Sequence, residues 1–172
     1  MMFGENKGLK FLIKEFPHYQ NSGYPTSVGV WEPSNLDVLF DIFKKIKLGQ
    51  QHTFLDAGSG DGRVVFLASL FCNSAIGIEA DPVLHFISSR KLEKHPFFHQ
   101  RAVILKEDYL EHDFSMYDVI FNYADGRVSK EMQRKCIDEM QPGSIGVFYV
   151  YNPYLPGTVM LEKKTPVWLF RK

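Results

Sequence analysis

Residues 56–62 read DAGSGDG, with glycine at every second position from Gly58 to Gly62. A short apolar run precedes this segment, and a helix extending to about Phe71 is predicted after it. Glycines permit positive φ angles and close approach of a ligand to the backbone at a strand-to-helix turn. The amino end of the helix adds free N–H groups and a positive dipole. We therefore predict a ligand-binding loop.

The spacing within this loop restricts the ligand. A dinucleotide-binding fingerprint requires a glycine three positions after Gly60, where this sequence has Arg63. A phosphate loop requires Gly-Lys-Ser/Thr, which the sequence lacks. Asp56 at the strand end and Asp61 inside the loop would repel a diphosphate. They would tolerate a ligand with a cationic amine, a sulfonium and one carboxylate, and S-adenosylmethionine carries these groups.

Two more acidic residues follow predicted strands. Glu79 ends the strand predicted for residues 74–79, about 20 residues beyond the loop, where a carboxylate can accept hydrogen bonds from both ribose hydroxyls. Asp108 follows the strand predicted for residues 102–106, with Tyr109 beside it. Open α/β sheets bind ligands at the carboxyl ends of their strands, so the loop and both acids are expected at one site.

LDAGSGDG resembles the first motif of class I S-adenosylmethionine-dependent methyltransferases, and GIEAD and KEDYL match their later acidic positions in order. The resemblance implies that Asp108 faces the adenine amine and that Tyr109 lies beside the adenine ring. The cofactor-binding residues that we expect are Trp31, Glu32, Asp56, Gly58, Ser59, Gly60, Asp61, Gly62, Arg63, Glu79, Ala80, Asp108, Tyr109 and Asn122.

The layout from Tyr24 onward is similar to that of lysine methyltransferases built on this fold rather than on the SET fold, namely the nucleosomal histone H3 enzyme and the ATP-synthase c-subunit enzyme with its bacterial relatives. The residues that carry this likeness include WEPSNLDVLFDIF, VIFN and GTVMLEKKTPVWLF. In that group the segment before the first helix covers the cofactor, which implies that residues 31–34 line its methionine end. Ser34 fits equally well as a helix N-cap.

Methyl transfer mainly requires alignment of the nucleophile and the methyl group about 3–3.5 Å apart. Asn122 ends the fourth predicted strand and Tyr123 follows it. The two could orient an amine there, although a strand-capping Asn122 and a packing Tyr123 are equally good interpretations. Asp125 is a weaker candidate for accepting a proton. The Asn/Asp-Pro-Pro-Tyr/Phe motif of nucleic-acid amino-methylating enzymes is absent, and the lack of a basic arm argues against histone.

The expected function is therefore methyl transfer to an amine, for which a protein lysine is one candidate. A small-molecule methyltransferase and a binding module that keeps the fold without catalysis are the alternatives. The intact acids Asp56, Glu79 and Asp108 argue against the binding module, and the absence of an inserted lid argues against an enclosed small substrate.

Strands that alternate with helices must position these residues, which predicts an α/β fold: a Rossmann-like, mostly parallel sheet with helices on both faces. The short link between the last two predicted strands also predicts a C-terminal antiparallel hairpin. We expect residues 1–50 to form a helical and loop segment that packs on the domain of residues 51–172. The predicted helices are 8–17, 36–48, 63–71, 82–95 and 128–140, and the predicted strands are 53–56, 74–79, 102–106, 118–122, 145–151, 158–163 and 166–170.

The composition of the 172 residues adds broad constraints. Twenty Lys and Arg balance 20 Asp and Glu, which argues against a nucleic-acid partner. The two cysteines form no CxxC pattern and the six histidines have no ligand spacing, so we expect no metal and a reducing, cytoplasmic location. No signal peptide or membrane span is expected. The methyl acceptor and the oligomeric state stay open.

Overall fold

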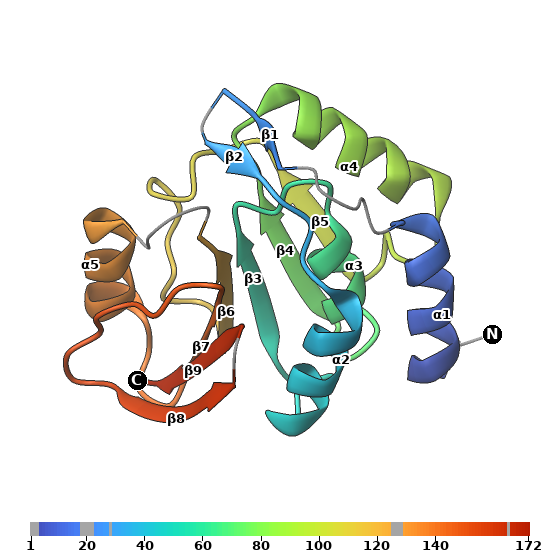
Figure 1. Cartoon of the computed structure of the whole chain (residues 1–172). Helices are drawn as coiled ribbons and strands as arrows, with labels where there is room; N and C mark the ends of the chain where they lie inside the picture. Colours follow the sequence, from blue (N-terminus) through green and yellow to red (C-terminus); the bar gives the residue numbers. More distant parts are fainter. Residues whose placement is uncertain (1–3, 18–22, 28, 125–128, 165) are drawn as a thin grey trace.

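The computed structural model describes residues 4–17, 23–27, 29–124, 129–164 and 166–172. Its main feature is a seven-stranded sheet with the order β5-β4-β3-β6-β7-β9-β8 (Figure 1). The first five strands are parallel, whereas β9 runs antiparallel to both β7 and β8. This confirms the predicted α/β fold with its C-terminal antiparallel hairpin. The strands are β3 (Thr53–Ala57), β4 (Ser74–Ile78), β5 (Ala102–Leu105), β6 (Val119–Tyr123), β7 (Ile145–Tyr149), β8 (Val159–Lys164) and β9 (Val167–Arg171).

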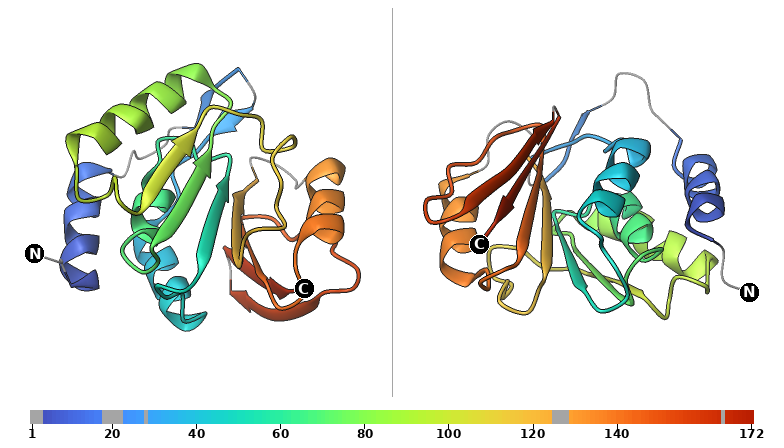
Figure 2. Two further views of the ribbon diagram at one scale, coloured as in Figure 1. Left: turned by 180° about the vertical axis from the view of Figure 1, so that it is seen from behind. Right: turned by 90° about the horizontal axis from the view of Figure 1, so that it is seen from below.

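Helices cover both faces of the sheet (Figure 2). Alternate residues of each strand point to opposite faces, so Phe54 of β3 joins one apolar cluster and Leu55 joins the other. The first cluster includes residues of α1, α2 and α3, with Leu92 of α4 packed against it, and the second includes Met132 and Cys136 of α5. The helices are α1 (Glu5–Glu15), α2 (Leu36–Lys45), α3 (Arg63–Ala68), α4 (Pro82–Lys94) and α5 (Lys130–Glu139).

The segment before α2 differs from the loop that the sequence predicts. β1 (Tyr24–Pro25) and β2 (Val30–Trp31) pair antiparallel as a small separate hairpin. Each strand has only two residues, and proline and glycine are poor strand formers, so no alternating pattern marks the pair. Figure 1 shows the hairpin beside the start of α4, above the end of the parallel sheet. It therefore lies where open α/β sheets bind ligands.

Several helix ends also differ from their predicted positions. The N-cap of α2 is Asn35 rather than Ser34, because the Asn35 side chain accepts a hydrogen bond from the Val38 N–H (3.1 Å). α3 ends at Ala68 instead of Phe71, since its last residues continue as turns. α1 begins at Glu5 and ends before Pro17, as a proline stop requires. Within the described ranges, no helix has the length and apolar character needed to cross a membrane.

Candidate active site

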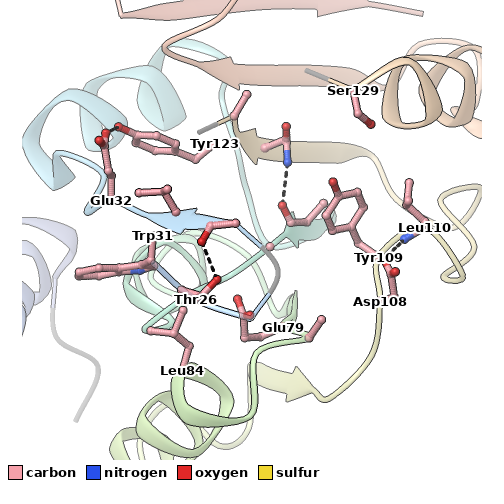
Figure 3. A pocket seen from close by; sticks show the side chains of 17 residues that line it. Thr26, Trp31, Glu32, Glu79, Leu84, Asp108, Tyr109, Leu110, Tyr123 and Ser129 are labelled. Carbon is pink, nitrogen blue, oxygen red and sulfur yellow. Dashed lines mark hydrogen bonds between the residues drawn. The ribbon is translucent and has the colours of Figure 1, made fainter. Parts of the chain in front are cut away.

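A cavity of about 380 Å³ opens at the carboxyl ends of β3, β4 and β6, beneath the β1–β2 hairpin (Figure 3). Its wall contains many of the residues that the sequence singles out: Trp31, Glu32, Gly58, Glu79, Ala80, Asp108, Tyr109, Asn122 and Tyr123. The wall also contains residues that no local sequence pattern marks: Thr26, Gly29, Val30, Ala57, Leu84, Leu110, Ala124 and Ser129.

The start of the glycine loop, at Ala57 and Gly58, forms the floor of the cavity. Gly58, Gly60 and Gly62 have φ angles of 85°, 56° and 84°, in the left-handed region that favours glycine. A Cβ on Gly60 would lie 2.3 Å from Nε1 of Trp31, so only glycine lets the hairpin pack onto the loop. A Cβ on Gly58 would meet only Tyr109, at 4.0 Å, which leaves room for a ligand over the backbone there.

Other predicted loop residues lie outside the cavity wall. Arg63 forms a buried ion pair with Asp61 (Nη2–Oδ2 2.8 Å). Its guanidinium also lies 5.6 Å from the Phe16 ring centre and 5.5 Å from that of Trp31. These contacts bind the loop to α1 and to the hairpin. Asp56, Ser59, Gly60, Asp61, Gly62 and Arg63 do not line the cavity, and their contact with a cofactor stays a prediction.

Glu79 connects the loop to the start of α4. Its Oε2 accepts a hydrogen bond from the Gly60 N–H (2.6 Å), and its Oε1 accepts one from the Asp81 N–H (2.7 Å). Burial raises the pKa of Glu79, while these two hydrogen bonds oppose that rise. A carboxylate has about four acceptor sites, so these two hydrogen bonds do not exhaust the acceptor capacity of Glu79, and its contact with the ribose stays a prediction.

Asp56 is buried below the cavity floor with 1% of its surface exposed. Neither of its carboxylate oxygens has a hydrogen-bond partner among the described residues. Burial, and then the charges of Glu79 and Asp61, raise the pKa of Asp56 well above its ordinary value. An unpaired buried carboxylate of this kind fits a ligand that brings positive charge to the floor.

A second polar group lies at the opposite end of the cavity from Asp108 and Tyr109, as Figure 3 shows. The Tyr123 hydroxyl donates to Oε2 of Glu32 (2.6 Å), which links β6 to the segment after β2. Burial, together with the Glu32 carboxylate, raises the pKa of Tyr123. The amide nitrogen of Asn122 donates to the Ala57 carbonyl (2.8 Å), which leaves the amide oxygen as its acceptor.

The remaining candidates have simpler surroundings. Asp108 is exposed, and its Oδ1 accepts from the Leu110 N–H (2.9 Å), which fixes the turn after β5. Pro33 and Ser34 do not line the cavity, and Ser34 is buried. Asp125 lies outside the described residues. Over the described ranges, no three His, Cys, Asp or Glu side chains are grouped in a way that could hold a metal ion.

Solved structures with the same fold include methyltransferases with different substrates. An RNA methyltransferase from Salinibacter ruber, in complex with S-adenosyl-L-homocysteine, has a TM-score of 0.65 at 19% identity, covering 81% of this chain and 92% of that one. A SAM-dependent O-methyltransferase from Thermotoga maritima has a TM-score of 0.61 at 15% identity, covering 80% of this chain and 49% of that one. At these identities the likeness shows the fold alone.

A third structure, of a precorrin 8W decarboxylase from Methanobacterium thermoautotrophicum, has a TM-score of 0.60 at 15% identity, covering 88% of this chain and 98% of that one. No curated protein matches the sequence. The sequence pattern of the ANTKMT methyltransferase domain matches residues 56–152, which are more than half of the chain and run from Asp56 at the end of β3 past β7. The chain therefore belongs to the ANTKMT methyltransferase domain family, and it is a class I S-adenosylmethionine-dependent methyltransferase.

Proposed function

We propose that the cavity holds S-adenosylmethionine over the Gly58 backbone and that the methyl acceptor is an amine, with a lysine side chain of a protein as the specific acceptor. The bound cofactor supplies a methyl group on a sulfonium, which the acceptor nitrogen attacks in line with the departing thioether. The contribution of the protein is to align the two groups and to exclude water.

Separate parts of the cavity suit the separate parts of the cofactor. Glu79 has acceptor capacity for the ribose hydroxyls, and Asp108 and Tyr109 lie together at the end of β5 for the adenine. Trp31 lies on the loop at Gly60 and forms part of the roof. The buried, unpaired Asp56 beneath the floor favours a ligand with positive charge. These observations support S-adenosylmethionine as the occupant.

The observation that supports an amine acceptor is the Glu32–Tyr123 pair in the cavity wall. The Glu32 carboxylate attracts a protonated amine and can accept its proton, which frees the nitrogen lone pair for attack. The amide oxygen of Asn122 can accept a second N–H of the same nitrogen and thereby orient it. The hydrogen bond from Tyr123 holds Glu32 in position.

A nucleic-acid acceptor has less support. None of the described residues that line the cavity is Lys or Arg, and the formal charge of the whole chain is zero. Affinity for nucleic acid comes largely from neutralising phosphates with basic side chains. The RNA methyltransferase from Salinibacter ruber shares the fold with this chain at 19% identity, which does not carry its substrate over.

Incubation of the purified chain with methyl-labelled S-adenosylmethionine and a cell lysate tests this proposal. We expect label in the protein fraction, released as methyllysine after complete hydrolysis. The variant that tests the role of the carboxylate is Glu32→Gln, which keeps the size of the side chain and removes its charge, and we expect less label from it. Label confined to RNA or to small molecules would overturn the acceptor assignment.

A further inference from the structure

Three carboxylates lie in the buried region under the glycine loop: Asp56, Asp61 and Glu79. Each is at most 5% exposed. Their charges act on one another, because those of Glu79 and Asp61 both disfavour ionisation of Asp56. Among the residues that the structure describes, the ion-pair partner of this cluster is the guanidinium of Arg63.

Two of the three carboxylates accept hydrogen bonds from the protein. Asp61 accepts the hydrogen bonds of Arg63 at 2.8 to 3.2 Å. Glu79 accepts two backbone N–H groups, one on each oxygen. Asp56 has neither kind of support within the described part of the chain. A buried carboxylate without a partner neutralises itself by binding a proton rather than bearing the cost of desolvation.

The other charged groups near this cluster provide no hydrogen-bond partner for Asp56 among the described residues. Lys91 of α4 interacts electrostatically with Asp61 and Arg63, and its Nζ lies 3.7 Å from the Phe16 ring centre. His85 of α4 acts on Glu79. On the neighbouring strands, the residues in register with Asp56 are Gly77 and Phe121, which carry no charge.

We propose that Asp56 carries a proton in the free protein and releases it to solvent when S-adenosylmethionine binds. The inference rests on the proposed cofactor site, because Ala57 and Gly58, which directly follow Asp56, line that cavity. The sulfonium and the ammonium of the cofactor outweigh its one carboxylate, so it brings a net positive charge. In a buried environment this charge acts over several ångströms and favours the ionised carboxylate. The O–H bond of Asp56 breaks, the proton passes to the buffer, and the cofactor is unchanged.

Calorimetric titration of the full chain with S-adenosylmethionine tests the inference. At neutral pH, the observed enthalpy is compared between phosphate and Tris, two buffers with different ionisation enthalpies. We expect a difference that corresponds to release of roughly one proton per cofactor bound. Because binding releases a proton, affinity should rise by about tenfold per pH unit while Asp56 is protonated in the free protein.

Asp56→Asn is the decisive variant, because asparagine resembles the protonated carboxyl in size and carries no charge. We expect it to fold and to bind the cofactor with an enthalpy independent of the buffer. Asp41→Asn, an exposed carboxylate on α2, is the matched control and should retain the buffer dependence. An infrared difference spectrum of the unsubstituted chain gives a second measurement, as the band of a protonated carboxylic acid should disappear on binding.

Each other outcome contradicts the inference in its own way. Cofactor binding without proton release would overturn it and leave the proposed function standing. Proton release that persists in Asp56→Asn would show that another group is responsible. Failure of the unsubstituted chain to bind S-adenosylmethionine would overturn the proposed cofactor site as well.

Discussion

At the scale of single residues, Glu79 has a structural role, and we expect it to have a binding role as well. Its two oxygens accept the backbone N–H groups of Gly60 and Asp81, so it fixes the loop and the start of α4 to the end of β4. The same carboxylate is the expected acceptor for ribose hydroxyls. Substitutions at Glu79 should therefore change both cofactor affinity and folding stability.

Glu79→Gln should weaken cofactor binding by about 1.5–3 kcal/mol, the usual contribution of hydrogen bonds to a charged acceptor. The melting temperature should also fall. The amide nitrogen of glutamine replaces one carboxylate oxygen and cannot accept the backbone hydrogen bond made at that position. Calorimetry and thermal unfolding measure the two effects separately. An unchanged affinity would show that the ribose binds elsewhere.

Tyr123→Phe removes the hydroxyl that donates to Glu32 while keeping the ring. We expect the rate of methyl transfer to fall by about tenfold or more, because loss of a hydrogen bond to a charged group corresponds to about 1.5–3 kcal/mol. The affinity for S-adenosylmethionine should stay within about twofold, since the pair lies at the acceptor end. Tyr151→Phe, at an exposed tyrosine outside the cavity wall, is the control. Equal loss in both variants would argue against an acceptor role for Tyr123.

At the scale of elements, the β1–β2 hairpin is held over the cavity by contacts to distant parts of the chain. The Ser27 N–H and hydroxyl both donate to Oδ2 of Asp81 (2.9 and 2.8 Å), while Oδ1 of Asp81 caps α4. Trp31 packs directly on Gly60. The roof of the site therefore depends on the loop and on the start of α4.

Gly60→Ala tests the packing of the hairpin on the loop. The new methyl group would clash with Trp31 and occupy a left-handed backbone conformation, which costs about 1–2 kcal/mol for a non-glycine residue. We expect a lower melting temperature and an altered Trp31 fluorescence. In the double variant with Trp31→Ala, the clash should disappear while the backbone cost remains. Simple additivity of the two single effects would contradict direct packing.

The anchor at Asp81 predicts a dependence of stability on pH. Hydrogen bonds from Ser27 and from the first turn of α4 lower the pKa of Asp81 from 3.8 to about 2. The folded state thus favours the ionised form, whose stabilisation is present above pH 4 and lost as the pH falls toward 2. Asp81→Asn should be less stable near neutral pH and show less of this loss in acid unfolding curves. Parallel curves for the two proteins would contradict the prediction.

At the scale of the whole molecule, two apolar clusters on opposite faces of one sheet support the site. Many of the 15 phenylalanines lie in the core, and edge-to-face ring pairs such as Phe43–Phe54, with centroids 5.2 Å apart, join the helices to the strands. The cavity opens where the strands that separate these clusters end. Its geometry therefore depends on the packing of the core beneath it.

Phe54→Ala should destabilise the fold by about 3–5 kcal/mol, because it removes a fully buried ring and leaves a cavity. Denaturant unfolding measures this change. Phe86→Ala is the matched control, since that ring on α4 is 64% exposed and its loss should change stability by less than about 0.5 kcal/mol. Similar losses in the two variants would be inconsistent with the packing of the first cluster.

The sequence by itself determined the alternation of strands and helices, the glycine loop, and the placement of Glu79 and Asp108 at strand ends. These features follow from local causes: apolar periodicity, the conformational freedom of glycine, and the rule that ligands bind at the carboxyl ends of parallel strands. It also predicted the antiparallel β8–β9 hairpin, because a two-residue link cannot form a parallel crossover.

Only the tertiary structure decided what roofs the cavity and which side chains meet in it. Ser27 meets Asp81 across 54 residues, and Tyr123 meets Glu32 across 91. Trp31 likewise packs against Gly60 from a distant part of the sequence. Such pairs leave no periodic or spacing signal, because their members come together only when the sheet and its covering helices have packed. The sequence alone therefore shows a glycine loop followed by acids in order. Long-range packing is what turns these residues into part of a cavity with two chemically different ends.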